Sequence, residues 1–158
     1  MSNVVYVTAE WLKKLEDELT HLKEVSRVEV AERLKEAISF WDLSENAEYE
    51  EARNVQSQVE VRITELEWTL KNIELIDETK KDTSKVNMGD SVTLESIDSK
   101  EKIEYLIVGS TESDILSTPP KISNESAVWA AMMWKKKWTT VKVKSDAWVK
   151  EYKILKIS

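Results

Sequence analysis

Apolar residues in the first part of the chain recur at every third or fourth position. The first such row is Leu12, Leu15, Leu19 and Leu22. This spacing is typical of the seam between two paired helices. The row becomes irregular over residues 25–31 and resumes at Leu34, Ala37 and Ile38. We therefore predict a helix from Ala9 to Phe40, with Thr8 as its N-cap, because a threonine hydroxyl accepts a hydrogen bond from the first helical turn.

A second apolar row follows with the same spacing. Its members are Ala52, Val55, Val59, Ile63, Leu66, Leu70 and Ile73. A single amphipathic helix leaves its apolar row in water, whereas two rows of similar length can bury each other. The sequence therefore predicts an antiparallel coiled-coil hairpin, with residues 41–49 at its tip.

The pattern changes near residue 80, where helical spacing gives way to short strands and turns. We predict strands at 92–94, 103–108, 140–144 and 150–157, a short helix at 126–133, and a loop at 110–124. The expected fold class is α+β. It comprises a helical hairpin domain in residues 1–78, a polar linker at 79–85, and a small β domain with a short helix in residues 86–158.

The composition excludes several classes of protein, such as disordered and membrane-spanning chains, and several kinds of site, such as those built on cysteine. The 158 residues are 41% hydrophobic, too many for a disordered chain, and no apolar run approaches the ~20 residues of a membrane span. The N-terminus has no signal-peptide pattern, so we expect a cytoplasmic protein that does not bind membranes. The absence of cysteine excludes thiolate chemistry, and a single histidine argues against zinc sites. The net charge of −7 argues against bulk attraction to duplex nucleic acid.

The predicted tip carries Asp42, Glu45 and Glu48. Asp42 and Glu45 are three residues apart and share a face on a helical turn. Two carboxylates can hold Mg²⁺ through oxygen, but they bind it weakly unless a partner adds ligands. Spacing alone leaves the alternative open, an acidic, solvated loop in which Asp42 is the N-cap of the second helix.

The tip segment at 42–49, DLSENAEY, closely resembles the tip motif of the Gre transcript-cleavage factors, GreA type. The resemblance extends over nearly the whole chain. The further matching segments are Thr8–Glu10, Ile76–Asp77, Lys121–Ser123, Ser126, and Met133 with Lys135 and Lys136. The resemblance implies a coiled-coil finger followed by an FKBP-like β domain.

The resemblance also implies a function. In this family the finger enters the secondary channel of bacterial RNA polymerase, and the C-terminal domain docks on the rim of that channel. Asp42 and Glu45 would then help to hold the second Mg²⁺ of the polymerase active centre and position the attacking water. The polymerase would cleave the nascent RNA 3′ end of a backtracked complex and resume elongation. The factor would be an accessory protein rather than an enzyme, and we expect a monomer without a cofactor of its own.

Further residues are assigned by their match to the family pattern. Asn46 and Tyr49 would shape the tip, and Arg53 would face the RNA. Ile38 stands where the family often has a basic residue, which implies weaker RNA contact and short cleavage products. The expected rim contacts are Ile122, Ser126 and Ala127, where the family commonly has Ser-Pro at positions 126–127.

Two other functions remain open. The first is a non-cleaving regulator that binds in the same channel, against which the intact pair Asp42 and Glu45 argues. The second is an adapter or chaperone-like module, which would leave the tip motif without a purpose.

The tryptophan content is unusual, with seven Trp and only two Gly. The tryptophans are residues 11, 41, 68, 129, 134, 138 and 148. Trp134 follows the predicted short helix, where glycine is usual, and Trp138 and Trp148 are placed in predicted turns. The family pattern has Gly at these positions and at Trp41, and often at Trp11 and Trp129. We predict that the tryptophans are glycines in the natural protein, encoded by UGA and misread as Trp. The alternative is a genuinely Trp-rich surface.

Overall fold

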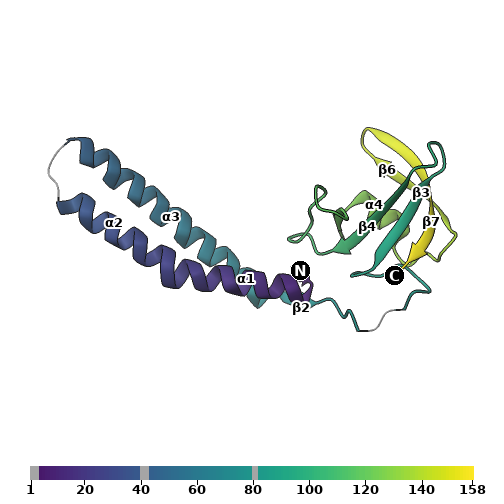
Figure 1. Cartoon of the computed structure of the whole chain (residues 1–158), viewed down its shortest axis with the longest axis horizontal. Coiled ribbons are helices and arrows are strands. Elements are labelled where there is room, and N and C mark those ends of the chain that lie inside the picture. The colour runs from purple at the N-terminus through teal and green to yellow at the C-terminus, as the bar shows by residue number, and fades with distance from the viewer. Residues whose placement is uncertain (1–3, 40–42, 80–81) are drawn as a thin grey trace. The chain divides into compact units, whose positions relative to one another are not determined.

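The computed structural model describes residues 4–39, 43–79 and 82–158. The chain forms two compact units (Figure 1). One is the helical hairpin, residues 12–72. The other is a globular unit that combines the N-terminal residues up to Trp11 with residues 73–158.

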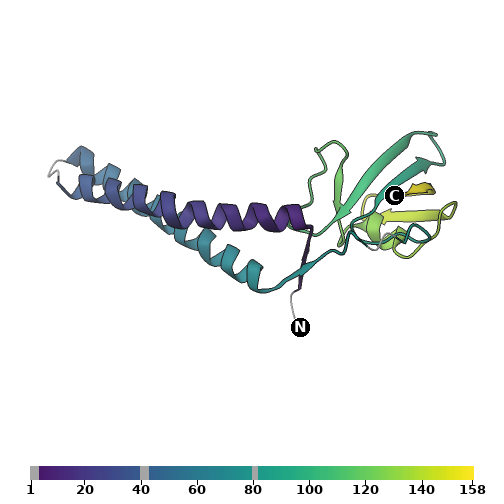
Figure 2. The same ribbon diagram turned by 60° about the horizontal axis from the view of Figure 1, so that its bottom comes forward.

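The hairpin has two long helical arms. The first arm contains α1 (Ala9–His21), the π-helical turn η1 (Leu22–Ser26) and α2 (Arg27–Ser39), and the second is α3 (Leu43–Lys71). At 29 residues, α3 is about 43 Å long. The two arms lie side by side in both ribbon views (Figures 1 and 2). The predicted helical hairpin is confirmed.

A narrow apolar seam joins the arms. Its buried members are Leu15, Val30, Ala37, Ala52, Ile63 and Leu66. The irregular stretch predicted at 25–31 overlaps η1, whose wider turn accommodates an extra residue in the helix. This turn allows Val30 to rejoin the seam, while Val25 and Val28 remain 39% and 53% exposed. Ile38, which the spacing placed on the seam, is instead 62% exposed.

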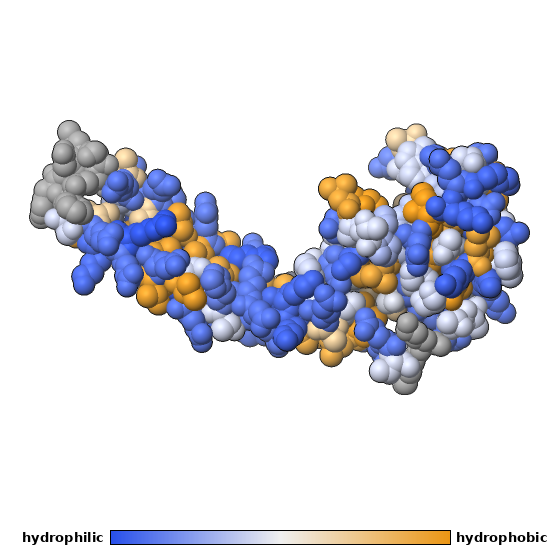
Figure 3. All heavy atoms as spheres, in the orientation of Figure 1, coloured by the Kyte–Doolittle hydropathy of each residue, from blue (hydrophilic) through white to orange (hydrophobic). Residues whose placement is uncertain are grey.

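Ion pairs connect the arms outside the seam. The Arg27 guanidinium makes two 2.7 Å hydrogen bonds to the Glu60 carboxylate, and Lys23 Nζ lies 2.5 Å from Glu67 Oε1. These hydrogen bonds lower the pKa of each carboxyl. Hydrophilic side chains cover much of the hairpin face seen in Figure 3. Such exposed pairs are individually weak, so they fix the alignment of the arms more than their stability.

The globular unit is built on a five-stranded sheet. Its strands are β3 (Ser91–Ser96), β4 (Lys102–Val108), β5 (Lys121–Ser123), β6 (Thr140–Ser145) and β7 (Trp148–Ile157). Their order is β5-β4-β3-β7-β6, antiparallel except for the β4–β5 pair. Buried and partly exposed residues alternate along β3, as expected for a sheet with one face on a core.

The short helix α4 (Ala127–Met132) contributes to the core of this unit. Trp129 and Met132 of α4 belong to one buried cluster with residues of five strands, among them Leu94, Ile107 and Ile154. The Ser126 hydroxyl caps the helix by accepting a 3.1 Å hydrogen bond from the Trp129 N–H. The α+β fold class is therefore confirmed, with a short helix near the predicted place.

The N-terminal segment, residues 5–8, packs against the globular unit through strand pairing and a buried hydrogen bond. Strand β1 (Val5–Val7) pairs in parallel with β2 (Ile73–Leu75). A Cβ atom at Gly109 would lie 1.6 Å from the Tyr6 carbonyl oxygen, so only glycine permits this approach. The Thr8 hydroxyl donates a 2.9 Å hydrogen bond to the buried Glu112 carboxylate and accepts one from the Trp11 N–H.

Several boundaries differ from the prediction. The strands β1, β2 and β5 were not expected, and Ile73 begins β2 rather than ending the second helix. The first helix is interrupted by η1. Trp148 is the first residue of β7 rather than part of a turn, because it pairs with Ser145 across a two-residue connection. The predicted domain boundaries at residues 78 and 86 stay a prediction. By compactness, the residues up to Trp11 group with the globular unit.

Replacing Glu112 by alanine tests the hydrogen bond between Thr8 and Glu112. Glu112 is 5% exposed and also lies 3.3 Å from Lys121 Nζ. The Glu112→Ala variant leaves a buried threonine hydroxyl without its acceptor, so we expect the free energy of unfolding to fall by about 1–3 kcal/mol in urea titration. The exposed Glu125→Ala is the control and is expected to change it by less than about 0.5 kcal/mol. Equal stability of the two variants would contradict the role of Glu112.

The ion pairs predict an acid-sensitive hairpin. The pKa values of Glu60 and Glu67 lie below the ordinary value of 4.5 because of Arg27 and Lys23. A lowered folded pKa stabilises the fold above the unfolded pKa, and the stabilisation is lost as pH falls through the folded value. We expect the helical melting temperature, followed by circular dichroism, to decline from about pH 5 to pH 3. Arg27→Gln should flatten this decline, and an unchanged slope would refute the assignment.

Candidate functional site

The candidate site is the turn of the hairpin, at the opposite end of the arms from Ala9 and Lys71. The last described residue of the first arm is Ser39, and α3 begins at Leu43. Asp42 lies outside the described residues and immediately precedes the first residue of α3. That sequence position is the one a capping carboxylate takes.

Glu45 and Asn46 belong to the first turn of α3, and the structure describes their backbone but not their side chains. A carboxylate in the first helical turn is favoured by the partial positive charge of the helix N-terminus. The helix thus begins at the residue that follows Asp42, which fits the alternative interpretation of Asp42 as an N-cap as well as the tip motif. That Asp42 and Glu45 share one face stays a prediction.

Tyr49 and Arg53 follow Glu45 along α3 at successive intervals of four residues. Residues at this spacing lie on adjacent turns of one side of a helix. The Tyr49 side chain is half-buried, whereas the Arg53 side chain is exposed. Arg53 is therefore available to a ligand that approaches the tip along this side of α3.

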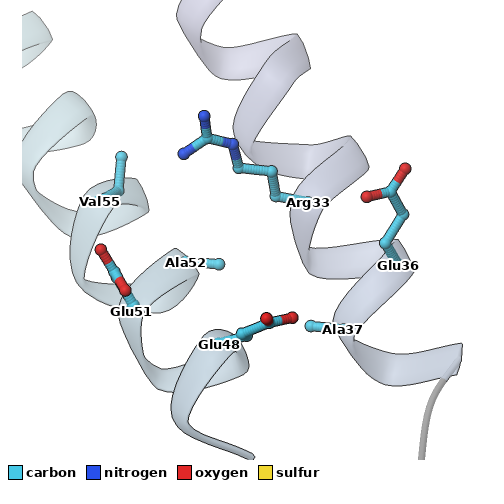
Figure 4. A pocket seen from close by; sticks show the side chains of 7 residues that line it. All are labelled: Arg33, Glu36, Ala37, Glu48, Glu51, Ala52 and Val55. Carbon is cyan, nitrogen blue, oxygen red and sulfur yellow. The ribbon is translucent and has the colours of Figure 1, made fainter. Parts of the chain in front are cut away.

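A pocket of about 240 Å³ lies between the arms below the tip. Its floor is formed by Ala37 and Ala52, which are 8% and 6% exposed. The Arg33 guanidinium projects toward α3, and the Glu48 carboxylate projects toward α2 (Figure 4). The remaining lining residues are Glu36, Glu51 and Val55. Small alanines open this pocket, and charged side chains surround it.

The sequence analysis anticipated Glu48 but not Arg33 or Glu51 at this end of the hairpin. The available signal was the pair of alanines on the two seams, since alanine leaves space where leucine would fill it. Between positions 32 and 53 the chain has seven acidic and three basic residues, a net charge of −4 out of −7 for the whole chain. The distal end of the hairpin is therefore acidic.

The predicted docking residues lie together on the globular unit, at β5 and the start of α4. Ile122 is 6% exposed and belongs to the core cluster. Ser126 is half-buried and occupied as the helix cap. Ala127 is exposed at the first position of α4. Of the three, Ala127 offers its side chain most directly to a partner.

In the described ranges, no group of three or more histidine, aspartate or glutamate side chains is arranged to hold a metal ion. None of the helices in the same ranges is long and apolar enough to cross a membrane.

Two family models match the chain. The model for the N-terminal part of transcription elongation factors matches residues 5–75. The model for the C-terminal part of GreA/GreB transcription elongation factors matches residues 80–158. Together they cover nearly all of the described structure.

Two relatives agree with these models in sequence. Transcription elongation factor GreA of Alkaliphilus oremlandii is 49% identical over 154 residues, which are 98% of this chain and 96% of the relative. GreA of Caldanaerobacter subterraneus subsp. tengcongensis is 46% identical over 157 residues, 99% of each chain. The crystal structure of GreA factor homolog 1 (Gfh1) of Thermus thermophilus has a TM-score of 0.44, with 23% identity over 99% of each chain. The chain belongs to the GreA/GreB family of transcription elongation factors.

Proposed function

We propose that this protein binds bacterial RNA polymerase through its secondary channel and stimulates cleavage of backtracked RNA. The observation that carries the proposal is the tip motif at 42–49 placed at the turn between two long paired helices. A turn of this kind has no core to stabilise, so its acidic residues are free to serve a ligand. Membership of the elongation-factor family supports the same assignment.

The chemistry follows from two carboxylates at one tip. Asp42 and Glu45 are hard oxygen donors, the ligand type that Mg²⁺ prefers. They would complete the coordination of an ion held by the polymerase and orient a water molecule for attack on the RNA phosphodiester. The ion supplies charge stabilisation and lowers the pKa of bound water. The tip contributes position and negative charge, and the polymerase contributes the rest of the site.

The surrounding residues fit a nucleic-acid strand that approaches the tip. Arg53 is exposed two turns along α3 from Glu45, where it could meet a phosphate. Asn46 and Tyr49 would fix the shape of the first turns of α3. With Ile38 exposed and uncharged, the first arm offers no cation at that position, which favours a weak grip on RNA and short products.

The globular unit would dock on the rim of the channel. The proposed contact is the surface at the start of α4, where Ala127 is exposed beside the capped Ser126. In this arrangement the factor acts as a monomer and as an accessory to the polymerase, with no cofactor of its own. A non-cleaving channel regulator is the second candidate, because docking and blocking need only the finger.

Neutralising the tip acids tests the chemistry. With stalled, backtracked polymerase, 3′-labelled RNA and Mg²⁺, we expect the Asp42→Asn, Glu45→Gln variant to lose transcript cleavage by about 100-fold or more, as when a preorganised polar group is removed from an active site. The measurement is the rate at which short 3′ fragments are released. The factor and RNA without polymerase should release none.

The matched control is Glu32→Gln, Glu50→Gln, which removes the same charge from exposed positions near the tip. It should retain cleavage within a few fold. Loss of cleavage in both double variants would attribute the effect to bulk charge and refute the assigned pair. If wild type and the tip variant release no fragments but both slow nucleotide addition, the protein is a channel-blocking regulator.

Substituting Ala127 tests the docking surface. An arginine at this exposed position adds bulk without disturbing the core, so Ala127→Arg should raise the factor concentration needed for half-maximal cleavage by roughly 10-fold or more. The rate at saturating factor should remain that of wild type, because the tip is unchanged. A lower saturating rate with unchanged half-maximal concentration would exclude Ala127 from docking.

A further inference from the structure

The two glycines of the chain both occupy positions that require glycine. Gly89 has φ +86°, and Gly109 has no room for a Cβ atom. Three other described residues have left-handed φ values, namely Lys100 at 60°, Trp134 at 61° and Trp138 at 69°. A bulky side chain at such an angle is a genuine outlier, because its Cβ atom crowds the following carbonyl.

Trp134 follows the end of α4. Met133 is the C-cap, and its N–H donates to the Trp129 carbonyl. The next residue, Trp134, therefore occupies the left-handed position at which helices most often end with glycine. The Trp134 N–H donates a 3.1 Å hydrogen bond to the Val86 carbonyl, and the Lys135 N–H donates to Met132. These bonds hold the backbone of Trp134 in place, so the residue cannot relax without losing them.

Trp138 is the third residue of a turn. The turn is closed by the Thr139 N–H, which donates a 3.2 Å hydrogen bond to the Lys136 carbonyl. A positive φ at the third position of a β-turn favours glycine. The Trp138 N–H donates a 2.7 Å hydrogen bond to the Ile154 carbonyl of β7, so the sheet fixes this backbone as well.

The two indoles contribute little that would offset this backbone strain. Trp134 and Trp138 are each 60% exposed. Lys137 Nζ and Lys153 Nζ lie 5.0 and 5.4 Å from the Trp138 ring centroid. These cation–π contacts are the alternative explanation for an aromatic residue at position 138. Cation–π contacts at exposed sites are weak, and they do not require a positive φ.

We propose that the natural protein carries glycine at positions 134 and 138. A UGA codon that the source organism reads as glycine, and that is written as tryptophan in this sequence, accounts for both residues. Glycine at both positions would raise the number of glycines from two to four, toward the usual Gly frequency of about 7%. The proposal concerns the covalent structure and is independent of the proposed function.

Among the described tryptophans, only Trp134 and Trp138 have left-handed φ values. Trp129 is buried in α4, and Trp68 lies within α3. Trp148 begins β7 and is not among the described residues with left-handed φ. Trp41 lies outside the described residues. These positions provide controls for the backbone argument.

The first experiment compares glycine with alanine in the full chain. At positions 134 and 138 the glycine variant should melt above the alanine variant by roughly 2–4 °C, because only the Cβ atom differs. At Trp68, inside a helix, the order should reverse. If alanine equals or exceeds glycine at 134 and 138, the backbone argument is overturned. The proposal also fails if the glycine and alanine variants both melt below the tryptophan protein by the same amount. The indole contacts would then explain why tryptophan stands at these positions.

The second experiment identifies the natural residues directly. Protein purified from its source organism is cleaved after glutamate, which yields the peptide of residues 126–151, and fragment masses are assigned residue by residue. Glycine at 134 and 138 establishes the proposal. Tryptophan at either position overturns it there, whatever the melting experiment gives.

Discussion

The mutual burial of two narrow apolar rows is the constraint on which the hairpin depends. Each arm has a single seam, and the buried seam residues run from Leu15 to Ala37 on one arm and from Ala52 to Leu66 on the other. Neither row could remain in water alone, so the arms form together or not at all. The buried seam ends with the two alanines Ala37 and Ala52 below the tip, and Ile38, next to Ala37, is exposed. Among the described side chains, the constraint of the apolar seam therefore stops at these alanines.

The sequence predicted the elements whose pattern is long and local. The seams extend over many turns, so the hairpin could be predicted from spacing. The π-helical turn was not predicted, and the irregular stretch at 25–31 overlaps only its last two residues. Strands of three residues carry too little periodicity, and β1 depends on a partner 68 positions away. The same applies to Glu112, whose hydrogen-bond partner Thr8 lies 104 positions away in the chain. Nothing near Glu112 in the sequence indicates that its carboxylate is buried.

The candidate site was predicted by its motif, and its physical setting could be predicted only in part. Spacing alone left open that Asp42 is only the N-cap of the second helix, and α3 begins at the next residue, Leu43. Docking residues were harder to predict, because the same residue types serve folding. Ile122 is a core residue and Ser126 is a helix cap, so a match to a family pattern at these positions does not separate a contact with a partner from a contact within the fold.

The backbone conformation of Trp134 also bears on an apolar groove in the globular unit. A groove of about 520 Å³ is lined by apolar side chains that include Leu75, Met88, Met133 and Trp134. An exposed apolar groove ordinarily suggests a docking site. Trp134, however, is the lining residue whose backbone favours glycine, and glycine there would remove one wall of the groove. Trp134 is one of ten residues that line the groove, so its shape depends in part on the residue at 134, and the start of α4 remains the proposed contact with a partner.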